Sequence, residues 1–173
     1  PPASVAQLVS GAHAPVVVSW GGGGNDLAGV ATTPQARACR QVPSCLGRFN
    51  GLLNEIEATI ELTIAAVRKG VGPAGRILMR TQYNALARSG CAPPDVVALP
   101  AAVLEGVPGT VLERGLNDRI RTVATSHGAT VVDLFVPFAF SPNTFIAPDC
   151  VHPTDAGYDT ITALSVAANV SGP

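Results

Sequence analysis

The chain alternates between short runs of branched apolar residues and longer stretches with helical periodicity. In the longest periodic stretch, apolar residues recur at steps of three and four from Leu46 to Val67, which places them on one stripe of a helix. Short runs rich in Val and Ile and bounded by turn residues are typical of buried strands. The predicted strands are 15–20, 76–82 and 130–135, the predicted helices 46–69, 110–126 and 154–168, and the predicted loops 21–26, 84–108 and 136–153.

This alternation predicts an α/β fold with a parallel sheet and right-handed crossover connections. The length of 173 residues suits a single domain over residues 1–173, and 47% hydrophobic against 13% charged residues excludes a disordered chain. The net charge of −1 lacks the strong basic excess of a nucleic-acid-binding protein. No apolar run approaches the roughly 20 residues that span a bilayer, so we expect no membrane span.

Four cysteines bear on the compartment: Cys39, Cys45, Cys91 and Cys150. They contain no Cys-x-x-Cys pair, which argues against a zinc site. More than one disulfide connectivity is possible, and we favour Cys39–Cys45, which closes a short polar loop, together with Cys91–Cys150. Disulfides would indicate a secreted, extracellular protein. The alternative is four free, partly buried thiols in a cytosolic protein.

Polar residues follow each predicted strand. In open parallel sheets, ligands bind beyond the carboxyl ends of the strands. We therefore expect an Asn, an Asp and a His to gather at one edge of the sheet. The candidates are Gly24 and Asn25 after the first strand, Tyr83 and Asn84 after the second, and Asp149 and His152 after the third.

Two of these groups have a clear chemical logic. A catalytic histidine needs one ring nitrogen held by a carboxylate so that the other can take a proton, and Asp149 and His152 have a suitable spacing. Asn25 can aim its amide at a developing oxyanion, and glycines before it allow close approach of the backbone. The alternatives are a chance Asp-x-x-His spacing and an ordinary glycine-rich turn. No Lys-Ser or Lys-Thr follows the glycines, which excludes a P-loop.

Together these residues resemble the SGNH, or GDSL, esterase and lipase family. The Gly-x-Asn-Asp motif of that family corresponds to Gly23–Asp26, and its Asp-x-x-His motif corresponds to Asp149–His152. The resemblance implies a three-layer α/β/α sandwich of the flavodoxin-like type. It also implies hydrolysis of carboxylic esters by a Ser-His-Asp mechanism, with no metal and no cofactor. A lipid ester and an acylated sugar fit equally well as the substrate, and a sugar-binding role is a weaker option.

The resemblance also implies roles for single residues. Asn25 becomes an oxyanion-hole donor, His152 the general base and Asp149 its orienting partner. A second Gly-x-Asn-Asp string lies at Gly115–Asp118, inside a helical pattern. We interpret this copy as chance, with side chains that face solvent or pack locally. Substrate binding is expected at Gly24, Tyr83 and Asn84.

The chain lacks the family's nucleophile, a Ser in a Gly-Asp-Ser motif after the first strand, and the second oxyanion glycine. It is similar to the last three strands of the family only, as the C-terminal part of the full domain. The strand at 15–20 would then be an exposed edge, which native proteins avoid. We therefore expect the serine to lie outside this chain, on an N-terminal fragment or partner chain that completes the sheet. This chain alone is expected to be inactive.

Three explanations fit this pattern. The chain is a piece of a longer or cleaved enzyme, or its sequence is incomplete, and a first residue of Pro1 fits either. The third explanation is a catalytically inactive homologue, a structural or interaction subunit that pairs with another protein through the exposed edge.

Overall fold

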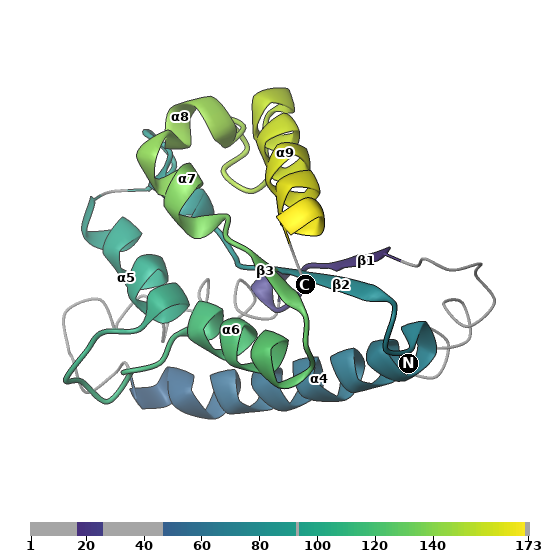
Figure 1. Ribbon diagram of the computed structural model, residues 1–173. Helices are drawn as coiled ribbons and strands as arrows, with labels where there is room; N and C mark the ends of the chain where they lie inside the picture. Colours follow the sequence, from purple (N-terminus) through teal and green to yellow (C-terminus); the bar gives the residue numbers. More distant parts are fainter. Residues whose placement is uncertain (1–16, 26–46, 93, 172–173) are drawn as a thin grey trace.

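The computed structural model of the chain describes residues 17–25, 47–92 and 94–171 (Figure 1). The strands are β1 (Val17–Trp20), β2 (Arg76–Arg80) and β3 (Thr130–Val132). The helices bounded within these parts of the chain are α4 (Gly47–Val71), η3 (Ala85–Ala87), α5 (Pro94–Glu105), α6 (Leu116–Ser126), α7 (Phe135–Phe140), α8 (Pro142–Phe145) and α9 (Asp155–Ser171). Gly24 and Asn25, after β1, also have a helical backbone.

The three strands form one parallel sheet in the order β1-β2-β3, and Leu78 of β2 is in register with Ser19 and Thr130. All three strands therefore end at the same edge of the sheet. Helices α4 and α6 cover one face and α9 covers the other (Figure 1), which confirms the predicted α/β fold with flanking helices. β3 ends at Val132, earlier than predicted, because the Thr81 hydroxyl accepts a backbone N–H just beyond it at 2.8 Å.

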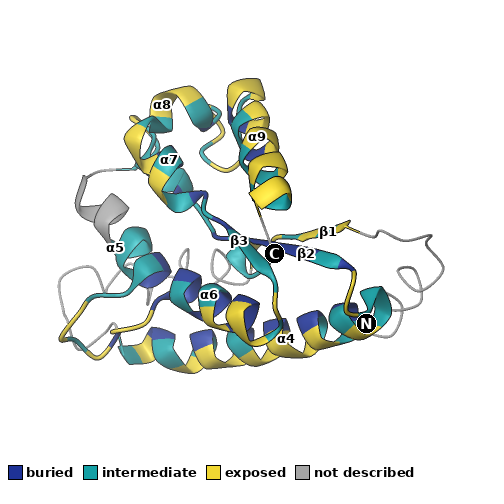
Figure 2. Ribbon diagram, in the orientation of Figure 1, coloured by how far each residue is buried: buried dark blue, intermediate teal, exposed yellow. Residues whose placement is uncertain are grey.

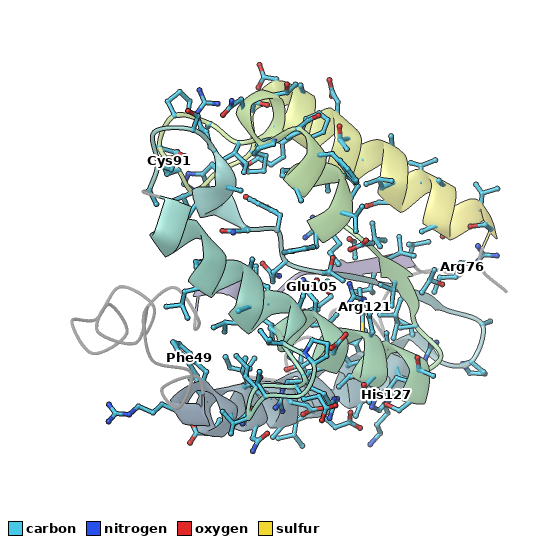
Figure 3. The ribbon with its side chains drawn as sticks, turned by 90° about the vertical axis from the view of Figure 1, so that its left-hand side faces the viewer. Phe49, Arg76, Cys91, Glu105, Arg121 and His127 are labelled. Atoms are coloured by element: carbon cyan, nitrogen blue, oxygen red, sulfur yellow. A yellow bond between two sulfur atoms is a disulfide. The ribbon has the colours of Figure 1, made fainter. Side chains whose placement is uncertain are left out.

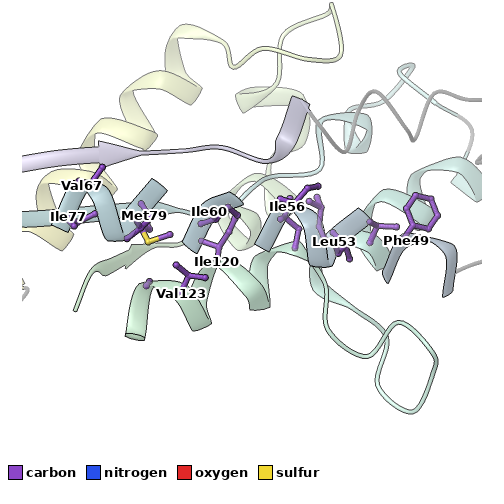
Figure 4. Close-up of a cluster of buried hydrophobic side chains, with 14 of the residues drawn as sticks. Phe49, Leu53, Ile56, Ile60, Val67, Ile77, Met79, Ile120 and Val123 are labelled. Carbon is purple, nitrogen blue, oxygen red and sulfur yellow. The ribbon is translucent and has the colours of Figure 1, made fainter. Parts of the chain in front are cut away.

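Side chains alternate along β2 and divide the core into two clusters. Ile77 and Met79 pack against α4 and α6, whereas Leu78 joins the cluster beneath α7 and α9. The apolar stripe of α4 is buried as its periodicity predicts, and Figure 2 shows the exposed side of this helix turned away from the sheet. The buried residues of α4, most of them labelled in Figure 4, are Phe49, Leu53, Ile56, Ile60, Ile64 and Val67.

The predicted loop 84–108 was wrong in part, because it contains η3 and α5. Its prolines suggested an irregular segment. Pro94 begins α5, however, where a backbone N–H would have no partner within the helix. Pro100 lies inside the helix, and we attribute its tolerance to the burial of Val103 and Leu104 in the core beside it.

The predicted loop 136–153 likewise contains α7 and α8. Pro137 lies in the first turn of α7 and Pro142 begins α8, and both positions tolerate proline for the reason given for α5. None of the helices in the described residues is long and apolar enough to cross a membrane.

The helix predicted over 110–126 begins only at Leu116. Thr110 does not cap it, because its hydroxyl donates to the Val107 carbonyl oxygen at 2.7 Å and closes a turn before the helix. Thr154 does cap α9 as predicted, since its hydroxyl oxygen accepts a backbone N–H from the first turn at 3.1 Å. This cap fixes the point at which the loop carrying Asp149 and His152 ends.

Candidate active site

Residues 147–153, between α8 and α9, form a tight loop around Asp149. One carboxylate oxygen, Oδ1, accepts the backbone N–H groups of Val151 and His152, each at 3.0 Å. The other oxygen, Oδ2, lies 2.8 Å from Nδ1 of His152. Cys150 completes the turn in the left-handed region, with φ of 63°. The two residues that the sequence pairs are therefore in direct contact.

These contacts lower the pKa of Asp149 from 3.8 to about 2. The largest cause is the backbone N–H of His152, followed by the His152 side chain and the N–H of Val151. The carboxylate is charged at neutral pH and can hold a proton on Nδ1 of His152, which makes Nε2 the nitrogen that can accept a proton. The His152 side chain is 67% exposed, so the imidazole is accessible to a substrate.

A disulfide ties this loop to the segment after β2. It joins Cys91 to Cys150, whose Cα atoms are 5.5 Å apart, and it confirms that predicted pair. The other predicted pair, Cys39–Cys45, lies outside the described residues. Arg88 adds hydrogen bonds to carbonyl oxygens in and just after α8, each at 2.7 Å. The disulfide thus fixes the loop covalently, and the Arg88 hydrogen bonds fix the end of α8, from which the loop starts.

Tyr83 provides a further contact between the segment after β2 and the histidine loop. Its ring stacks on Phe138 with centroids 4.4 Å apart, and its hydroxyl donates to the Val151 carbonyl oxygen at 2.7 Å. Burial, then the neighbouring Tyr158 and Asp149, raise the pKa of Tyr83 to about 12. The hydroxyl therefore keeps its proton at neutral pH and remains a donor beside the Asp149–His152 pair. Its role in substrate binding stays a prediction.

Gly24 and Asn25 lie at the same edge of the sheet, just after β1. Asn25 is exposed. A Cβ atom on Gly24 would lie 2.5 Å from Oε1 of Gln82, so a side chain there would have to displace the end of the Gln82 side chain. Asn84 is buried, and its side-chain oxygen accepts the N–H of Leu86 at 3.1 Å, which caps η3. The structure thus links Tyr83 directly to the histidine loop and places Asn25 at the end of an adjacent strand.

An open groove lies beside the glycine run, between the end of β1 and α4, with a volume of about 370 Å³. Apolar and polar side chains share its lining. The lining residues are Trp20, Gly22, Gly23, Leu52, Glu55, Ile56, Thr59, Ile60 and Thr63. Space for a small group therefore exists on the α4 side of the glycine run.

Sequence reasoning missed the role of Asn117, which belongs to the second Gly-x-Asn-Asp string. This side chain was expected to face solvent or to pack locally. It is instead completely buried, and it binds both backbone groups of Gln82, 35 residues away. One signal was present, because Asn117 lies three residues before the buried Ile120 and so shares the buried face of α6.

Comparison with known proteins identifies the family of the chain. A model of the GDSL-like Lipase/Acylhydrolase family matches residues 4–160, which is most of the chain. No curated protein and no solved structure matched the chain. The family match confirms the resemblance drawn from the motifs and supports an ester-type hydrolase at the level of the family. With its parallel sheet, its flanking helices and this match, the chain belongs to the GDSL-like Lipase/Acylhydrolase family.

Proposed function

We propose that this chain supplies the histidine and aspartate of a serine ester hydrolase whose nucleophilic serine lies outside residues 1–173. The observation that carries the proposal is the contact between Oδ2 of Asp149 and Nδ1 of His152, at 2.8 Å on an exposed loop. A charged carboxylate on Nδ1 leaves Nε2 as the base that activates a serine hydroxyl. Membership of a lipase and acylhydrolase family supports an ester as the substrate.

The proposed reaction has two halves. The serine oxygen attacks the ester carbonyl while His152 takes the serine proton on Nε2, and the tetrahedral intermediate then collapses. The C–O bond to the alcohol breaks, His152 returns the proton to the alcohol, and an acyl-serine ester remains. Water then attacks this ester with His152 again as base. The products are the free carboxylic acid and the regenerated serine.

Asn25 is the proposed donor to the negative oxygen of the tetrahedral intermediate. It follows β1, at the edge of the sheet where the loops after β2 and β3 also lie. One such donor lowers the barrier by about 3 kcal/mol in serine hydrolases. Gly24, Tyr83 and Asn84 remain the proposed substrate-binding residues.

The edge of the sheet at β1 supports a partner strand. Among the described residues β1 pairs only with β2, and Val17 is 47% exposed. An open strand edge promotes association with other chains. We propose that the fragment or partner chain carrying the serine adds its strand here. The Cys91–Cys150 disulfide supports an extracellular location for the assembly.

A labelling experiment tests this proposal. The native protein is purified from its source, every chain is identified by intact mass and N-terminal sequencing, and the assembly is treated with a serine-directed fluorophosphonate. We expect a labelled Gly-Asp-Ser segment in the assembly and loss of labelling in His152→Ala. His127→Ala is the matched control, because His127 contacts Glu61 at 2.6 Å on another part of the molecule. An intact assembly that takes no label would favour the inactive structural subunit instead.

A further inference from the structure

The side chain of Gln82 crosses the glycine run that precedes Asn25. Its Nε2 donates to the carbonyl oxygen of Gly22 at 3.0 Å. Its Oε1 lies against Gly24, where an added Cβ atom would be only 2.5 Å away. The amide orientation is fixed, because only Nε2 can donate to a carbonyl oxygen. One planar group therefore binds the run at Gly22 and lies close to Gly24, just before the proposed oxyanion donor.

Gly23, within the run, lies against two apolar side chains. A Cβ atom on Gly23 would lie 3.2 Å from Ile56 and 3.3 Å from Leu116. Gly23 has φ of +87°, a conformation that side-chain-bearing residues rarely adopt. The run thus has a polar contact with Gln82 and apolar contacts with one residue of α4 and one of α6, beside the open groove.

Gln82 is itself held by the buried Asn117. Oδ1 of Asn117 accepts the Gln82 N–H at 2.7 Å, and Nδ2 donates to the Gln82 carbonyl oxygen at 2.9 Å. Nδ2 of Asn117 also donates to the Glu105 carboxylate at 2.5 Å. Glu105 in turn forms an ion pair with Arg121 at 3.0 Å, and Figure 3 shows these two side chains next to each other. Asn117 thus binds Gln82 as a neighbouring strand would, beyond the point where β2 ends.

We propose that Gln82 is a positioning residue for the oxyanion donor, and that Asn117 fixes Gln82 in the position it needs for this. The inference rests on the proposed role of Asn25. Asn25 is exposed and follows a run of four glycines, which by themselves leave the backbone many conformations. The bond from Gln82 to Gly22 restricts that freedom and aims the Asn25 amide before a substrate arrives.

Gln82→Glu tests the proposal through pH. The introduced carboxylate cannot donate to the Gly22 oxygen while it is charged, but it regains an O–H donor when it is protonated, near its reference pKa of about 4.3. In the complete assembly at neutral pH we expect kcat for p-nitrophenyl acetate to fall about 10- to 100-fold with little change in KM. The ratio of the variant's kcat to that of the wild type should then rise as the pH falls from 7 to about 4.

Gln82→Met is the matched control, because it keeps the length of the side chain but cannot donate at any pH. Its kcat should fall similarly, and its ratio to the wild type should not change with pH. Asn54→Ala removes a hydrogen bond between Asn54 on α4 and Arg119 on α6, and it should leave kcat unchanged. Wild-type kcat in Gln82→Met, or equal pH dependence of both Gln82 variants, would overturn the inference.

Hydrogen exchange of backbone amides tests the same idea without turnover. In Gln82→Met the amides of residues 22–25 should exchange faster, while those of Val151 and His152 should keep their wild-type rates. Unchanged exchange at residues 22–25 would overturn the inference, even in an active enzyme. If the wild-type assembly takes no fluorophosphonate label, the proposed function fails separately, and the exchange rates still decide whether Gln82 holds the run.

Discussion

Removal of the Cys91–Cys150 disulfide should cost both stability and the order of the histidine loop. The bridge spans a sequence separation of 59 residues, and the chain-entropy model gives about 4 kcal/mol for a closed loop of that size. We therefore expect Cys91→Ser with Cys150→Ser to lower the free energy of unfolding by about this amount. For a chain of this length the melting temperature should fall by roughly 8–16 °C.

The backbone conformation of Cys150 has a separate effect on the stability of the variants, because this residue adopts φ of 63°. Serine in this conformation is strained, whereas glycine is not, so Cys91→Ser with Cys150→Gly should be the more stable of the two variants by about 1 kcal/mol. Urea unfolding followed by circular dichroism measures the free energy of unfolding of the wild type and of both variants. A loss below about 1 kcal/mol for the serine variant would refute the entropic reasoning. A glycine variant no more stable than the serine variant would refute the assignment of strain to Cys150.

Three further predictions follow from the site and the core. Asp149→Asn should lower kcat of the assembly about 10²- to 10⁴-fold in an ester-hydrolysis assay, because an amide would donate to Nδ1 of His152 and favour the wrong tautomer; unchanged kcat would remove Asp149 from the mechanism. The pKa of Asp149 is lowered to about 2, so its stabilising contacts are complete above pH 3.8 and are lost as the pH falls through about 2. Carboxyl NMR of Asp149 measures that titration, and a midpoint near 3.8 would contradict it. Ile64→Ala should lower the free energy of unfolding by about 2–5 kcal/mol, since Ile64 is completely buried. Leu62→Ala, at a 66% exposed position, should stay within about 0.5 kcal/mol of the wild type in the same urea titration.

The parts of the fold that local chemistry decides could be predicted from the sequence. The stripe of α4 is buried because its apolar residues recur at steps of three and four and so fall on one side of the helix, and that spacing is visible in the sequence itself. The contact between Asp149 and His152 was also predictable, since it forms within four consecutive residues. The turn that brings them together needs only the Asp149 side chain and the backbone N–H groups that follow it.

The contacts between distant segments could not be predicted in this way. Asn117 and Gln82 are joined across 35 residues, and neither residue type signals such a pair when it is met alone in a sequence. The prolines led to wrong loop predictions for a related reason. Pro137 and Pro142 lie in the first turns of α7 and α8, where proline is tolerated. The presence of a proline in the sequence does not distinguish such a position from one inside a helix, where proline breaks the helix. The Asn117–Gln82 contact and the proline positions both depend on where helices and strands begin, and the packing of the whole fold decides where they begin.

Gln82 and Tyr83 are consecutive residues, yet the first binds the loop after β1 and the second binds the loop before α9. Two consecutive residues therefore contact both the loop that carries the proposed oxyanion donor and the loop that carries the proposed base. A one-residue deletion between β2 and η3 would rotate each side chain toward the other's partner. Length changes in this short connection should therefore abolish activity even where every proposed catalytic residue is retained.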